Sequence, residues 1–127
     1  MGVGAHVYVN GEYETCIAKF ENQEEVEMLV NDLRNLMKQG FKHKCCEWIG
    51  EVDCEKVKEF FETEFKDYLE DDDDVYGYIE EQLGYWQWEV EAIEELYEVC
   101  MENKGANIKV VIEDYDCENS DENCGDY

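Results

Sequence analysis

Carboxylates are the side chains in this sequence whose number and spacing most clearly suggest a chemical role. The chain has 35 Asp and Glu residues against 10 Lys and Arg, which gives a formal net charge of −25. An acidic run over residues 70–74 leads directly into an aromatic-rich segment, and residues 70–103 contain no Lys or Arg. An exposed helix ordinarily intersperses bases among its acids, because opposite charges four residues apart stabilise it. Unbalanced carboxylates attract cations or basic protein surfaces, so these are the two ligand classes to weigh.

The negative charge is concentrated in the second half of the chain. Residues 1–66 carry 14 acids and 8 bases, a net −6, whereas residues 67–127 carry 21 acids and two bases, a net −19. A surface of this sign repels nucleic acid and anionic membranes. We therefore expect neither as a direct partner, and expect a basic protein surface instead.

Calcium binding is disfavoured by the pattern of the acidic run. An EF-hand loop beginning at Asp72 would place Gly77 at its sixth position, as required. Its twelfth position would be Leu83, where the loop needs a bidentate carboxylate. The run is therefore expected to bind cations weakly and without a defined site.

Enzymatic chemistry has few candidate groups. The only serine is Ser120, and His6 and His43 are the only histidines. Neither histidine has the spacing of a catalytic triad, and no glycine-rich phosphate loop is present. We expect a protein that is not an enzyme and that needs no cofactor.

The seven cysteines are odd in number and irregularly spaced. Without a signal peptide, reduced thiols are the expectation, and the lack of a paired C-x-x-C pattern disfavours a zinc site. One zinc alternative stays open, using His43, Cys54 and either Cys45 or Cys46. The N-terminus MGVGAHVYVN lacks the features of a signal peptide, and no apolar stretch approaches the ~20 residues of a membrane helix. A cytoplasmic protein is therefore expected.

The elements that would position the carboxylates follow from hydrophobic periodicity. Asn10-Gly11 predicts a β-hairpin within the first twenty residues. Helices are predicted over 23–39, capped by Asn22, and over 54–69, capped by Asp53. Strands are predicted over 41–52 and 108–112, with a loop over 70–74.

The third predicted helix is the longest, over residues 75–103, with a possible kink near Tyr85. Its apolar seam includes Trp86, which is expected in the core. The fold class is α+β: an N-terminal β-hairpin plus two further strands in one small sheet, covered by three helices. Residues 1–113 are expected to form one domain, and 114–127 a disordered acidic tail.

The outer face of the third helix is the predicted interaction surface. Its glutamates recur every three or four residues, about 5–6 Å along the axis, a step of the same order as successive phosphates of a nucleic-acid strand. The acidic run and some exposed aromatics would extend it. The predicted partner-binding residues are Glu70, Asp71, Asp72, Asp73, Asp74, Tyr76, Tyr78, Glu80, Glu81, Trp88, Glu91, Glu94, Glu95, Glu98 and Glu102.

In size, charge and acidic helix the chain resembles the DNA-mimic inhibitors of phages and mobile elements, such as antirestriction and anti-CRISPR proteins. The resemblance covers mainly residues 69–127 and implies a partner with a basic nucleic-acid groove, in a bacterial host. An acidic immunity protein or antitoxin that neutralises a basic nuclease is the alternative. A high-salt adaptation fits less well, because seven bases lie between Arg34 and Lys66. The sequence leaves open whether the protein is a monomer or a homodimer.

Overall fold

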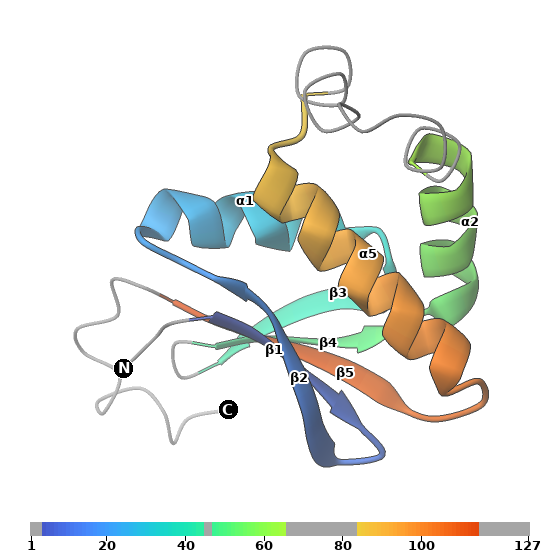
Figure 1. Ribbon diagram of the computed structural model, residues 1–127. Helices are drawn as coiled ribbons and strands as arrows, with labels where there is room; N and C mark the ends of the chain where they lie inside the picture. Colours follow the sequence, from blue (N-terminus) through green and yellow to red (C-terminus); the bar gives the residue numbers. More distant parts are fainter. Residues whose placement is uncertain (1–3, 45–46, 66–83, 115–127) are drawn as a thin grey trace.

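A five-stranded antiparallel sheet forms the base of the fold in the computed structural model, which describes residues 4–44, 47–65 and 84–114 (Figure 1). The strand order is β2-β1-β5-β4-β3, so that β5 is central and β2 and β3 are the edges. The strands are β1 (Gly4–Val9), β2 (Glu12–Lys19), β3 (Met37–Lys44), β4 (Glu47–Val52) and β5 (Ile108–Glu113).

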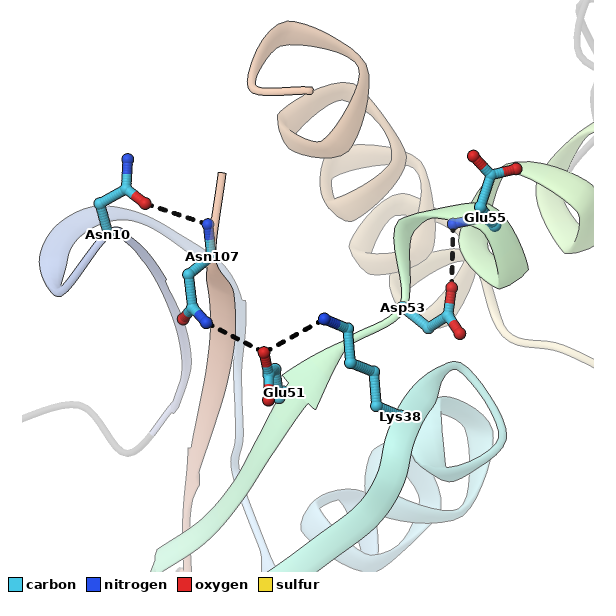
Figure 2. Close-up of polar contacts among 6 residues, drawn as sticks. All are labelled: Asn10, Lys38, Glu51, Asp53, Glu55 and Asn107. Atoms are coloured by element: carbon cyan, nitrogen blue, oxygen red, sulfur yellow. Dashed lines mark hydrogen bonds and ion pairs between the residues drawn. The ribbon is translucent and has the colours of Figure 1, made fainter. Parts of the chain in front are cut away.

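The N-terminal hairpin forms as predicted, because its turn residues accept left-handed backbone conformations. Asn10 and Gly11 have φ values of 53° and 85°, which a two-residue hairpin turn requires. The turn is also fastened to the start of β5. The Asn10 backbone N–H donates to the Asn107 carbonyl at 2.7 Å. The Asn107 N–H donates to Asn10 Oδ1 at 3.0 Å (Figure 2).

Three helices pack on one face of the sheet: α1 (Gln23–Arg34), α2 (Cys54–Glu64) and α5 (Gln87–Glu102) (Figure 1). Asn22 caps α1 by accepting from the Glu25 N–H at 2.9 Å. Asp53 caps α2 by accepting from the Glu55 N–H at 3.1 Å (Figure 2). Both predicted caps are confirmed. None of the helices in the described residues is long and apolar enough to cross a membrane.

The core lies between the helices and the sheet. Val7, Val110 and Ile112 are fully buried on the sheet side. They meet helix residues that are equally buried, Leu29 from α1 and Ile93 and Leu96 from α5. The predicted α+β class, with an N-terminal hairpin and helices on one face, is therefore confirmed.

The region between the first two helices differs from the prediction. Helix α1 ends at Arg34, not at residue 39, and the single strand predicted over 41–52 is two antiparallel strands, β3 and β4. Leu36 and Met37 are buried to 3% and 2% exposure. Leu36 enters the core from the turn after α1 and Met37 from β3, and both would also have suited a longer helix, so hydrophobicity alone could not place the helix end.

The third helix also begins later than predicted. Gly84 has a φ of +80° and Trp86 has extended backbone angles, so helix α5 starts at Gln87. Residues 84–86 are therefore not helical, and what the prediction described as a possible kink is the entry into the helix. The rest of the predicted start, 75–83, lies outside the described residues, as do 66–69 of the second predicted helix.

Candidate interaction surface

Five glutamates form an acidic stripe along the outside of α5. Glu91, Glu95, Glu98 and Glu102 are exposed and Glu94 is half-buried. These five residues, called the α5 stripe below, lie opposite the buried Ile93, Leu96 and Cys100. The stripe runs about 16 Å along the helix axis at a rise of about 1.5 Å per residue. The structure thus brings together the five predicted site residues from 91 to 102.

The stripe is an unneutralised negative surface. None of its five carboxylates has an ion-pair partner among the described residues. The pKa of Glu94 is raised by partial burial and then by the neighbouring charges of Glu98, Glu91 and Glu95. A carboxyl that is harder to ionise because of its neighbours indicates a surface that a cationic partner would stabilise.

The position of α5 is fixed by its contacts with α2. The Tyr97 ring stacks on Phe61 with centroids 4.4 Å apart, and its hydroxyl donates to Glu62 Oε2 at 2.7 Å. The helix also packs over β2, and Trp88 contacts Phe20, the residue after β2, edge-to-face with ring centroids 6.1 Å apart. The stripe therefore has a rigid support along its length.

The aromatic residues are arranged differently from the prediction. Trp86, expected in the core, is 56% exposed at the N-terminal end of α5. Trp88, predicted among the partner-binding residues, is half-buried and packs against the core, and its contact with a partner stays a prediction. The prediction for Trp86 is wrong because the helix begins at Gln87, which leaves Trp86 outside the helical periodicity that the seam assumed.

A buried carboxyl pair, which the sequence prediction missed, lies beneath the start of α5. Glu89 is only 3% exposed, and its Oε1 accepts from the Trp86 N–H at 2.9 Å. Asp32 on α1 is hydrogen-bonded to Glu89, while its Oδ2 is buried without a partner among the described residues. Burial first, and then Glu89, raises the pKa of Asp32 to about 8. The Asp32–Glu89 pair therefore retains a proton at pH values where two separate carboxyls would both be ionised.

The sequence did contain a signal for this pair. Glu89 precedes Ile93, Leu96 and Cys100 by 4, 7 and 11 residues, which is the spacing of the buried face. An acid at such a position needs a partner.

Tyr85 lies nearby, packed on Phe65 with ring centroids 5.3 Å apart. Its pKa is raised by burial and by the charges of Asp32, Glu64 and Glu89.

The remaining predicted site residues are outside the described part of the chain. They are Glu70, Asp71, Asp72, Asp73, Asp74, Tyr76, Tyr78, Glu80 and Glu81. The prediction for them therefore stays a prediction.

Of the residues proposed as zinc ligands, His43 and Cys54 are described, and both contact other side chains. His43 stacks on Trp48 at 4.2 Å and pairs with Asp114. Cys54 lies against Cys100, whose pKa is raised by burial and by Cys54. Cys45 and Cys46 lie outside the described residues. Within the described ranges, no three His, Cys, Asp or Glu residues are placed to hold a metal ion.

No protein-family model, curated protein or solved structure matches this chain. Its function is therefore inferred from its own charge and geometry.

Proposed function

We propose that this protein inhibits a nucleic-acid-binding defence protein of a bacterial host, such as a CRISPR effector or a restriction enzyme. The α5 stripe would occupy the basic groove that normally receives the nucleic-acid backbone. The observation that carries the proposal is the stripe itself: five glutamates on one face of a helix, without an ion-pair partner among the described residues. The proposed activity involves no catalytic step, and it places the protein in the host cytoplasm.

Rigidity supports this function because a mimic must hold its charges in position before binding. Helix α5 is held by the Tyr97–Phe61 stack and the Tyr97–Glu62 hydrogen bond. A charged surface that needs no rearrangement loses less conformational entropy when it binds. Complementary charge acts mainly on the association rate and its salt dependence, which defines what an experiment should measure.

Trp86 provides an exposed apolar side chain at the N-terminal end of the helix that carries the stripe. It is one of two large hydrophobic side chains in the described residues that are strongly exposed. Tryptophan is enriched among residues that contribute most to binding energy at protein interfaces. Its backbone N–H is fixed by the buried Glu89, so the position of Trp86 is coupled to the start of the helix.

The target can be found by capture from bacterial lysate at low and high salt, followed by binding kinetics with the purified partner. Glu91→Gln/Glu95→Gln/Glu98→Gln removes three charges from the stripe. The control Glu14→Gln/Glu27→Gln/Glu59→Gln removes three charges from exposed residues of β2, α1 and α2. Both variants have the same net charge, so only the location of the lost charge differs.

We expect the stripe variant to associate at least tenfold more slowly than the parent, and the control to stay within threefold. Nucleic acid should compete with the inhibitor for the target. Equal association rates for the parent and the stripe variant would refute the proposal. A ternary complex of target, inhibitor and nucleic acid without loss of affinity would also refute it. Capture of a nuclease toxin, neutralised by the same stripe, would instead support the immunity-protein alternative.

A further inference from the structure

The second face of the sheet carries no helix within the described residues (Figure 1). Side chains alternate between the two faces of a strand, so the neighbours of the buried Val7 and Val110 point to this open face. Strand pairing arranges its side chains in rows across the sheet. One row is Lys42, Ile49, Val111 and His6, and the next is Glu51, Lys109, Tyr8 and Tyr13.

The open face differs from the rest of the molecule in charge. On β3, β4 and β5 it carries four lysines, Lys38, Lys42, Lys44 and Lys109, against three glutamates, Glu47, Glu51 and Glu113. In a chain with a net charge of −25, this part of the face is close to neutral. Two copies of the chain repel each other least when they approach through it.

The lysines surround a hollow of about 220 Å³ on the β3–β4–β5 half of the face, lined in part by Lys38, Lys42 and Lys109. Lys38 donates to Glu51 Oε2 at 3.2 Å, and that oxygen also accepts from Asn107 Nδ2 at 2.9 Å (Figure 2). Lys42 and Lys109 have no ion-pair partner among the described residues. This half of the face therefore presents unneutralised cations.

The β1–β2 half of the face is aromatic. Tyr13 is 56% exposed and lies edge-to-face with Tyr8, with ring centroids 5.8 Å apart. The ring centroids of His6 and Tyr13 are 5.9 Å apart. Ammonium groups are attracted to the faces of aromatic rings, and the attraction strengthens when both lose water. The two halves of the open face are thus complementary to each other.

We infer that the open sheet face is a homodimer interface, with a second copy of this chain as its occupant. Strand β5 is central, with β1 and β2 on one side and β4 and β3 on the other. A two-fold axis parallel to β5 exchanges these sides. It lays the β3 lysines of each copy over the tyrosines of its partner, with the two sheets about 10 Å apart, while Lys109 on the central strand lies near the axis. A two-fold axis that lies between the two sheets but runs perpendicular to the strands would instead place the lysines of one copy over the lysines of the other.

Dimerisation through the open face would affect the proposed function, although the interface does not depend on that function. Stacking the open faces directs the helices of both copies outward, so the dimer carries two α5 stripes on opposite surfaces. A dimeric partner could then be bound at two sites, which increases apparent affinity without new contacts.

The test compares two double charge reversals by sedimentation velocity over a concentration series at moderate salt. Lys38→Glu/Lys42→Glu changes two exposed β3 lysines of the open face. The control Lys56→Glu/Lys58→Glu makes the same change in net charge at two exposed positions of α2. We expect the parent and the control to dimerise with constants within threefold of each other, and the open-face variant to dimerise at least tenfold more weakly. Circular dichroism establishes that both variants are folded.

Tyr13→Ser provides a second, neutral perturbation, which should also weaken dimerisation at least tenfold. A monomeric parent throughout the series would overturn the inference, even if the open face bound some other molecule. Dimerisation of the open-face variant with the same constant as the control would overturn it as well. Because the α5 stripe variant should still dimerise, failure of the dimer and failure of target binding can be told apart.

Discussion

The replacement Asp32→Asn should make the protein less sensitive to alkaline pH. The pKa of Asp32 is raised from 3.8 to about 8, first by burial and then by the hydrogen bond and the charge of Glu89. The folded state therefore binds more protons than the unfolded state between about pH 4 and pH 8. This contribution to stability is complete below the unfolded pKa and is lost as pH rises through the folded pKa. The parent protein should consequently be more stable at pH 5 than at pH 8.5.

The rise in the pKa of Asp32 from 3.8 to about 8 corresponds to roughly 6 kcal/mol, at about 1.4 kcal/mol for each pH unit. Asp32 is only partly buried, and contact with water screens the interaction, so we expect on the order of 2 kcal/mol. Asparagine has the same shape, cannot ionise, and can donate to the Glu89 carboxylate. Asp32→Asn should therefore match the parent at pH 5 and exceed its free energy of unfolding by about 2 kcal/mol at pH 8.5.

Urea denaturation at constant ionic strength, followed by circular dichroism between pH 5 and 8.5, measures these free energies. The matched control is Glu27→Gln, which removes one negative charge from an exposed position of the same helix. Its pH dependence should be parallel to that of the parent. The reasoning is refuted if Asp32→Asn has the same slope as the parent, or if the parent gains stability between pH 5 and 8.5.

Three further predictions concern the sheet and the net charge. Asp114→Ala should lower the free energy of unfolding by about 2–3 kcal/mol in urea denaturation at pH 7. The largely buried Asp114 carboxylate accepts a hydrogen bond from Trp48 Nε1 at 2.8 Å and also binds Gln23 and His43. A loss below about 0.5 kcal/mol would contradict this expectation. Its hydrogen bonds lower the pKa of Asp114 despite burial, so this stabilisation should disappear as the parent is acidified below about pH 4. Gly50→Ala should reduce the free energy of unfolding by about 1–3 kcal/mol in the same assay. A Cβ atom at this position would lie 2.9 Å from side-chain atoms of Met37 and Phe41. An unchanged urea midpoint would show that these side chains can move aside. Raising NaCl from 20 to 200 mM should increase the melting temperature by screening the −25 charge, and an unchanged or lower value would argue against charge strain.

Local chemistry determined those parts of the fold that the sequence predicted well. Asn10-Gly11 specifies a hairpin turn through its own backbone preferences, and Asn22 and Asp53 cap the helices that follow them through bonds to residues two or three positions away. The apolar repeat of each helix and the alternation in β5 are properties of neighbouring residues as well. None of these features needs distant contacts, so the α+β class followed from the sequence.

The five glutamates of the α5 stripe were also predictable, because residues three or four apart share a helix face wherever the helix begins. The start of the helix was not, and it decided which tryptophan is exposed. The apolar seam extended through Trp86, but Gly84 and Trp86 adopt backbone angles that are not helical. Hydrophobic periodicity gives the faces of a helix, whereas its first residue depends on how the chain enters the packed layer.

By itself, the sequence determined the charge, the turns, the caps and the faces of the elements, since each depends on residues that are close together in the chain. Only the tertiary structure decided where α1 ends and β3 begins, because buried side chains at Leu36 and Met37 are compatible with a longer helix as well as with the observed turn and strand. It alone brought Asp32 of α1 against Glu89 of α5 and so raised a carboxyl pKa to about 8. It alone arranged lysines from β3 and β5 beside tyrosines from β1 and β2 on one uncovered face. Such pairings join residues far apart in the chain, and they exist only once the sheet order and helix packing are established.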